Sequence, residues 1–418
     1  MRWTLTSPDG LGDFLLRLPW LLAMQKAGWK LQLLCRTPTA ELAELCGINA
    51  EFVPLRLSPY SKEARRRLFP FRREIRSISR FKPDTIFLGP SQPTFLEEQI
   101  VQKLRGANVG GFRVNASFWP GEGMMEPAEL CKMFSFVVDV SGEDSEPVRN
   151  AKAAAYMLGR ESSGPLSPFR FSAATVEALP KSKAVPSRYL VVCAGYREGD
   201  YFKGWGSENW AAELRALQQE TALPLVFVGG SPESAAHREI FAALASSDRN
   251  VDLTGRCGDL RELCGVLAGA ETYIGKDCGA MHLSSALGKP VVAVFGGGHR
   301  NRFHPTGTRA VALSVDVPCR GCDWRCHLAE PTCVRGLAPG SLLAGWRFLQ
   351  EQRSDSCANL LQPLESNAKQ DLGFHEDASY PARAHAAKRR SMREDRRKSL
   401  WWLGRKAMAP ERAAQTSP

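Results

Sequence analysis

Short apolar runs alternate with longer stretches of helical length along the chain as far as Gln352. In the first half, strands are predicted at residues 3–6, 30–34, 50–53, 85–88 and 108–110, and stretches such as 13–26 and 94–105 predict helices between them. Strands that alternate with helices are typical of a parallel sheet whose faces are covered by helices.

The alternation restarts after an irregular region, residues 141–188, which has one good helix candidate at 149–158. Strands are then predicted at residues 189–194, 225–228, 250–253, 272–274 and 291–295, and helices at residues 207–220, 232–245, 260–267 and 279–287. The run YLVVCAG is apolar almost throughout, which suits a strand buried on both faces.

Two such units in succession predict an α/β fold with two Rossmann-like domains that face a central cleft. We expect the N-terminal domain over residues 1–165 and the C-terminal domain over residues 166–353. Ligands of these sheets bind beyond the carboxyl ends of the strands. Residues 354–418 lack the apolar residues for a core, so we expect a basic tail that is disordered or partly helical.

Composition fits a protein of the cytoplasm. The chain has 418 residues, of which 44% are hydrophobic, enough for two cores. No apolar run is long enough to cross a bilayer, and Asp9 and Asp13 interrupt the N-terminal apolar run before a signal peptide could form. Twelve cysteines in this length do not indicate a disulfide scaffold.

The net charge of +11 is unevenly distributed. Residues 380–418 contain eleven Lys and Arg against three acidic residues, and residues 62–82 contain nine against two. Such segments bind polyanions, or else form solvated helix faces. No RNA-recognition motif is visible, so nucleic acid is not an expected partner.

The stretch IGKDCGAMHLSSALG, residues 274–288, predicts an anion site. A strand that ends at Lys276 and a helix that begins near Gly279 leave the first amides of the helix free to bind a phosphate. Asp277 is placed to cap the helix, and His282 could donate to a phosphate oxygen or a leaving group. The alternative is a capped helix with an ordinary histidine.

Three further residues follow predicted strands and are candidates for a site. Lys203, in the loop after residues 189–194, could meet a diphosphate, or it could be a surface lysine between packing aromatics. Glu233 in VGGSPES could accept ribose hydroxyls, or it could be a first-turn acid. Asp13 could likewise be an ordinary first-turn acid or a general base that projects into the cleft.

The GLGDFLLRLP element, the K-x-W loop, the KDCGAMHLSSALGKP run and the FGGGHRNRFHPTG segment resemble glycosyltransferase family 9. That family comprises the ADP-heptose:lipopolysaccharide heptosyltransferases, of GT-B fold, and the resemblance covers roughly residues 1–352. It implies sugar transfer with inversion and no catalytic metal or cofactor. The residue roles it implies are Asp13 as base, Lys203 on the donor phosphates, Glu233 near the ribose, and Asp277, Gly279 and His282 at the diphosphate.

The chain departs from the family pattern at Cys278, where Thr or Ser is common. A thiol is a weaker hydrogen-bond donor than a hydroxyl, so the identity of the donor sugar stays open. The resemblance also implies a nucleotide-sugar donor and an anionic, lipid-linked glycan acceptor at the cytoplasmic face of the inner membrane. The acceptor-binding candidates are Arg65, Arg66, Arg72 and Arg73.

Four cysteines lie close together in CRGCDWRCHLAEPTC: Cys319, Cys322, Cys326 and Cys333. Thiols at this density suggest a structural zinc site or an iron–sulfur cluster, in which His327 could replace one thiol. Unmetallated thiols or a facultative disulfide are the alternative.

Two rival functions remain compatible with these residues. A GT-B nucleotide-sugar 2-epimerase would not need Asp13, and a catalytically silent nucleotide-sugar-binding or assembly protein would use the same cleft for binding alone.

Overall fold

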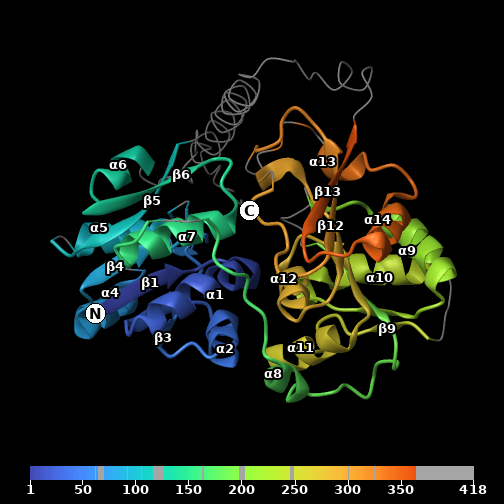
Figure 1. The fold of residues 1–418 in the computed structure, drawn as a ribbon, viewed down its shortest axis with the longest axis horizontal. Helices are drawn as coiled ribbons and strands as arrows, with labels where there is room; N and C mark the ends of the chain where they lie inside the picture. The colour runs from blue at the N-terminus through green and yellow to red at the C-terminus, as the bar shows by residue number, and fades with distance from the viewer. Residues whose placement is uncertain are drawn as a thin grey trace, which may run out of the picture.

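The computed structural model describes residues 1–61, 63–64, 70–91, 93–104, 106–115, 127–161, 164–196, 203–244, 249–299, 301–322, 326, 328 and 330–363. Two sheets form, and every strand pair within them is parallel. Figure 1 shows each sheet with helices packed around it. The predicted α/β fold with two Rossmann-like units is therefore confirmed.

The first sheet has the strand order β3-β2-β1-β4-β5-β6. Its strands are β1 (Arg2–Ser7), β2 (Lys30–Cys35), β3 (Ala50–Pro54), β4 (Thr85–Leu88), β5 (Val109–Asn115) and β6 (Phe136–Ser141). The helices around it are α1 (Leu11–Lys26), α2 (Thr37–Leu45), α4 (Arg72–Phe81), α5 (Phe95–Lys103), α6 (Pro127–Cys131) and α7 (Glu146–Met157). The order reverses between β1 and β4, which creates a crevice at the carboxyl end of β1.

The second sheet has the strand order β13-β12-β11-β10-β7-β8-β9. Its strands are β7 (Leu190–Cys193), β8 (Leu225–Phe227), β9 (Val251–Asp252), β10 (Thr272–Lys276), β11 (Val291–Val294), β12 (Ala310–Asp316) and β13 (Cys357–Pro363). Its helices are α8 (Ala173–Glu177), α9 (Ser207–Thr221), α10 (Ser234–Ala243), α11 (Leu260–Gly269), α12 (Gly279–Ala286), α13 (Thr332–Arg335) and α14 (Ser341–Glu351), with short 3₁₀ turns η2 (Ser231–Glu233) and η3 (Gly297–His299). Here the order reverses between β7 and β10.

Strand β13 lies beyond residue 353, where we expected the tail to begin. It pairs with β12 over seven residues, from Ala310–Cys357 to Asp316–Pro363. The second sheet therefore extends further along the chain than the apolar pattern indicated, because β13 is an edge strand whose residues are only half-buried or exposed. The rest of the predicted tail, residues 364–418, lies outside the described residues.

Helix α1 is the element on which both units pack. Trp20 on α1 lies in the core, with its ring 5.3 Å from that of Trp3 on β1 and 4.8 Å from that of Phe87 on β4. The other side of α1 contacts α7 and α12. This double burial explains why α1 is apolar on nearly all sides instead of carrying a single apolar stripe.

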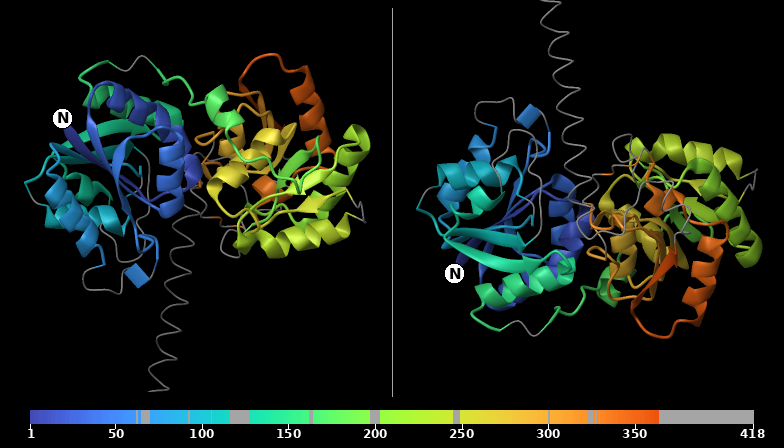
Figure 2. Two further views of the ribbon diagram at one scale, coloured as in Figure 1. Left: turned by 90° about the horizontal axis from the view of Figure 1, so that it is seen from below. Right: turned by 90° about the horizontal axis from the view of Figure 1, so that it is seen from above.

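The two units lie side by side in the views from below and above (Figure 2), joined by the chain that runs from α7 to α8. A direct bond also joins them: the Glu146 N–H donates to the Arg302 carbonyl at 2.9 Å. The connecting chain is fixed to the C-terminal unit by the Phe171 N–H, which donates to the Ala286 carbonyl at 3.0 Å. Within the described ranges, none of the helices combines the length and apolar character that crossing a bilayer requires.

The start of α14 depends on a carboxylate from α9. The buried Glu213 side chain accepts the backbone N–H groups of Gly340 and Leu342. We expect Glu213→Ala to lower the free energy of unfolding by about 1–3 kcal/mol, because it leaves buried amides without an acceptor. Chemical denaturation measures this change.

Glu220→Ala is the matched control. Glu220 also joins α9 to α14, through the exposed Arg347, and solvent screens an exposed ion pair. An equal loss of stability in the two variants would contradict the role given to Glu213.

Candidate active site

The carboxyl ends of β7 and β10 meet the start of α12, as the sequence predicted. Strand β10 ends at Lys276, and Cys278 takes the extended N-cap conformation with φ −162° and ψ 175° before α12 begins at Gly279. A Cβ added at Gly279 would lie 3.2 Å from the Leu11 side chain on α1. The N-terminus of α12, where amides are free to bind an anion, therefore faces the N-terminus of α1 across the two units.

Asp277 does not cap α12, contrary to the prediction. The N-cap residue is Cys278, and no side-chain cap bond is present there. The Asp277 carboxylate instead accepts from Lys203 Nζ at 3.1 Å. Burial alone would raise the pKa of Asp277, but Lys203 and His282 outweigh it and lower that pKa. Two of the predicted diphosphate residues thus form one ion pair at the end of the sheet.

His282 reaches from α12 to the first turn of α1. Its side chain is buried, its Nε2 lies 3.9 Å from Asp277 Oδ1, and a Cβ added at Gly12 would lie only 2.5 Å from His282 Cδ2. Burial lowers the pKa of His282 to about 4, despite the opposing charge of Asp277. His282 is therefore neutral at pH 7 and can offer an N–H, but not a positive charge.

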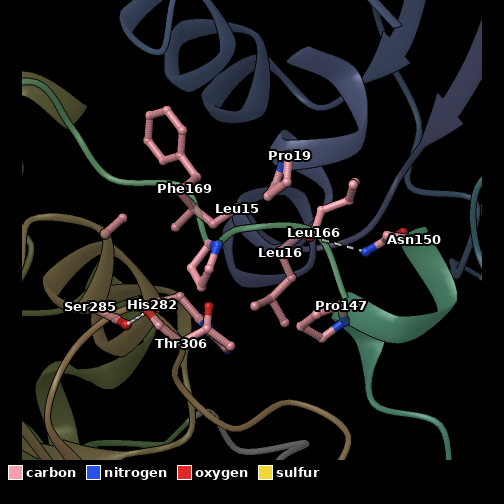
Figure 3. Close-up of a pocket in the computed structure, with 12 residues that line it drawn as sticks. Leu15, Leu16, Pro19, Pro147, Asn150, Leu166, Phe169, His282, Ser285 and Thr306 are labelled. Atoms are coloured by element: carbon pink, nitrogen blue, oxygen red, sulfur yellow. Dashed lines mark hydrogen bonds between the residues drawn. The ribbon is translucent and has the colours of Figure 1, made fainter. Parts of the chain in front are cut away.

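An apolar hollow between the two units lies behind His282 (Figure 3). Leu15 and Leu16 of α1, Pro147 and Asn150 of α7, and Phe169 of the connecting chain line it together with His282. Asn150 Nδ2 donates to the Leu16 carbonyl at 3.1 Å, which ties α7 to α1 on this side.

Asp13 occupies the first turn of α1 and accepts the N–H of Gly10 at 3.2 Å. Burial, together with the charges of Asp9 and Glu146, raises the pKa of Asp13 to about 7 against the opposing charges of Arg17 and Arg302. A carboxylate with a pKa near neutrality suits a general base.

Sequence reasoning missed the charged residues around Asp13. Arg17 is fully buried and donates to Ser7 Oγ at 2.6 Å, to Asp9 Oδ2 at 3.1 Å and to the Gly89 carbonyl at 3.1 Å. A lone arginine in the apolar run LLRLPW was the available signal, since a buried charge requires partners.

Glu146 and Arg302 extend this network across the units. Arg302 Nε donates to Glu146 Oε2 at 2.7 Å, and Arg17 lies 3.9 Å from the other Glu146 oxygen. Glu146 begins α7 in the N-terminal unit, whereas Arg302 follows η3 in the C-terminal unit. The local sequence could not reveal this pair, because 156 residues separate its members.

Glu233 lies at the carboxyl end of β8, and both of its oxygens are occupied. Oε1 accepts from Lys276 Nζ at 3.1 Å, and Oε2 accepts the Gly230 N–H at 2.8 Å. Burial alone would lower the pKa of Lys276, but the negative charges of Cys278 and Glu233 raise it. Lys276 is a second cation of this site, and the sequence indicated it only as the end of a strand.

The predicted acceptor arginines are only partly described. Arg65 and Arg66 lie outside the described residues. Arg72 and Arg73 are exposed on α4 and, with Arg56, Arg76 and Arg80, line an open hollow. None of the residues around that hollow is Asp13, Asp277 or one of the residues described above as their partners. The structure therefore does not bring these arginines into the site.

The described residues do not support the predicted metal at the four-cysteine cluster. All four thiols are buried around one small apolar cavity lined also by Val317 and Leu328, but no group of three or more His, Cys, Asp or Glu in the described chain is arranged to hold a metal ion. Burial raises the pKa of Cys319 to about 12. None of the twelve cysteines is in a disulfide, and His327 lies outside the described residues.

Comparison with known proteins identifies the type of fold. A model of glycosyltransferase family 9 (heptosyltransferase) matches residues 135–331. Lipooligosaccharide heptosyltransferase 2 of Campylobacter jejuni is 27% identical over 145 residues, which are 34% of this chain and 44% of that relative, so the match spans less than half of the relative's length.

Solved structures resemble the chain over a longer stretch. ADP-heptose LPS heptosyltransferase II of E. coli covers 84% of this chain and 100% of its own, with a TM-score of 0.60 and 16% identity. The E. coli heptosyltransferase WaaC with ADP-2-deoxy-2-fluoro heptose covers 84% and 99%, with a TM-score of 0.58 and 18% identity. At these identities the likeness shows the fold.

The contact of Gly12 with His282 generates a prediction. We expect Gly12→Ala to lower the free energy of unfolding by about 1–3 kcal/mol, because the new methyl group overlaps the His282 ring and either the ring or α1 must shift to make room. Gly10→Ala is the matched control, since its Cβ would meet Asp13 Oδ2 at an ordinary 3.4 Å. Thermal or chemical denaturation of both variants measures the difference; a Gly12→Ala protein as stable as the control would refute the contact.

Proposed function

We propose that this chain is an inverting glycosyltransferase of family 9. It transfers a heptose or a related sugar from a nucleoside diphosphate donor to a lipopolysaccharide core or similar glycan. ADP-heptose is the proposed donor. The observation that carries the proposal is the juxtaposition of Asp13, with its pKa of about 7, and the N-terminus of α12, through the contact of Gly12 with His282.

The C-terminal unit supplies the groups for the donor. The free amides at the start of α12 and the ammonium group of Lys203 bind the diphosphate, and Gly279 lets a phosphate approach the backbone. Glu233 accepts a ribose hydroxyl while Lys276 holds the carboxylate in place. These fixed donors stabilise the charge that develops on the leaving diphosphate.

The N-terminal unit supplies the base. Asp13 takes the proton from the acceptor hydroxyl, and the oxygen then attacks the anomeric carbon on the face opposite the diphosphate. The bond from the anomeric carbon to the phosphate oxygen breaks, and its electron pair leaves with the diphosphate. Attack from the opposite face inverts the configuration of that carbon.

The hollow lined by the arginines of α4 suits the remainder of an anionic acceptor. Guanidinium groups bind phosphates and carboxylates in bidentate geometry. Arg72 and Arg73 begin α4, and Arg76 and Arg80 continue along its exposed side. We propose that they bind acidic groups of the lipid-linked glycan, which places the enzyme at the cytoplasmic face of the inner membrane.

Replacement of the base tests the proposal directly. We expect Asp13→Asn to lower kcat for sugar transfer by roughly 10²–10⁴ without weakening the binding of ADP. Asp139→Asn, which removes an exposed carboxylate paired with Arg113, is the control and should keep full activity. Retained sugar-nucleotide epimerisation in Asp13→Asn would favour an epimerase, and binding of ADP by an inactive wild type would favour a binding protein.

The donor is identified by thermal stabilisation with a panel of ADP-, UDP- and GDP-sugars. A ligand present at a hundred times its Kd should stabilise the protein by roughly 2.7 kcal/mol. Stabilisation by a UDP-sugar in place of ADP-heptose would reject the proposed donor and leave the reaction type standing.

The pH dependence follows from the pKa of Asp13. Because the base must be ionised, kcat/KM should rise with pH up to about 7 and level off above it. Asp9→Asn removes the larger of the two negative charges that raise the pKa of Asp13, so the rising limb should move to lower pH. A rate profile that is flat between pH 5 and 8, or a limb that does not move in Asp9→Asn, would contradict the assignment of Asp13.

A further inference from the structure

We propose that Cys193 and Cys278 form an oxidation-sensitive dithiol beneath the donor site, and that a peroxide converts it to a disulfide that weakens nucleotide binding. The two sulfur atoms are in hydrogen-bond contact at 3.6 Å. Cys193 ends β7 and Cys278 stands at the N-cap of α12. Strand β10, which ends two residues before Cys278, is the neighbour of β7 in the sheet, and Cys193 pairs with Gly275 of β10. The two thiols therefore meet without any rearrangement of the fold.

The surroundings divide the two thiols into a nucleophile and a resolving partner. Cys278 is half-buried, and the hydrogen bond with Cys193 lowers its pKa to about 6 against the effect of burial, with help from Lys276. The position at the start of α12 also favours a thiolate. Cys193 is buried, and its contact with Cys278 together with burial raises its pKa well above the ordinary value. Cys193 therefore keeps its proton until it reacts.

The oxidation balances with hydrogen peroxide as the oxidant. The Cys278 thiolate attacks one peroxide oxygen, the O–O bond breaks, and hydroxide leaves a sulfenic acid on Cys278. The Cys193 sulfur then attacks the Cys278 sulfur; the S–S bond forms, the S–O bond breaks, and the Cys193 proton leaves with the oxygen in water. Two thiols lose two electrons, and one peroxide becomes two waters. A thiol reductant reverses the bond.

The expected loss of nucleotide affinity after disulfide formation rests on the proposed function. A disulfide brings the sulfurs to about 2.05 Å, so the Cys278 side chain must move toward Cys193 on β7, and its 3.2 Å contact with the Tyr273 hydroxyl is disturbed. Cys278 stands between Asp277 and Gly279, and the movement displaces the first amides of α12. Loss of the thiolate charge acts in the opposite direction, but Lys276 already offsets that charge within the sheet, so the displaced amides decide the outcome.

Peptide mapping and nucleotide binding test the proposal on the full chain. After treatment with hydrogen peroxide and alkylation, mass spectrometry should detect a disulfide between the peptides that contain Cys193 and Cys278. Calorimetry with ADP should show a Kd at least tenfold higher than in the untreated protein, and dithiothreitol should restore the original value.

Two variants make the test specific. Cys193→Ala should bind ADP as the untreated wild type does and keep that affinity at a peroxide dose that converts the wild type. Cys35→Ala, which removes a buried thiol of β2, should lose affinity as the wild type does.

Three results would overturn the proposal: no link between Cys193 and Cys278 in the oxidised wild type, a link without a change in affinity, or an equal loss of affinity in Cys193→Ala. If untreated protein binds no ADP, the proposed donor fails, and the peptide map alone still decides whether the dithiol exists.

Discussion

The contact between two helix N-termini, one from each unit, is the constraint on which the site depends. In a parallel sheet the carboxyl ends of all strands lie at one edge. In both sheets the strand order reverses once, and a crevice opens at that edge beside the reversal. The absence of a side chain at Gly12 lets the ring of His282 lie directly against α1. The first turn of α1, which carries Asp13, thus lies against the first turn of α12, although no local stretch of sequence contains both.

The charges around Asp13 show how a fold holds a carboxylate near neutrality. Asp9, Asp13 and Glu146 would repel one another strongly if they were alone in a buried place, and two arginines offset them. Arg17 is fixed by Ser7 and Gly89 as well as by Asp9, so three partners hold its charge in place. Burial and repulsion prevail over the arginines at Asp13, whereas at Glu146 the charges of Arg302 and Arg17 overcome burial and lower the pKa.

Much of the fold was predictable because buried parallel strands are short apolar runs. The predicted strands of β1, β4, β8 and β11 match the structure within one residue or so at either end. The edge strand β13 was not predicted, because its half-buried and exposed residues do not form an apolar run. Within the site, the sequence indicated Asp13, Lys203, Asp277 and His282, which all follow strand ends, but it missed Arg17, Glu146 and Arg302, whose partners are distant along the chain. Spacing suggested a metal site among four cysteines, although it could not show whether their sulfur atoms converge.

The Glu146–Arg302 pair links proton binding to the separation of the two units. Arg302 belongs to the C-terminal unit, and its positive charge lowers the pKa of Asp13, which belongs to the N-terminal unit. Burial is nevertheless the largest cause of the raised pKa of Asp13, and exposure to water would remove it. An arrangement with the two units apart would therefore bind the Asp13 proton less tightly than the packed arrangement. By linkage, acidic conditions favour the packed arrangement, and loss of the proton favours separation.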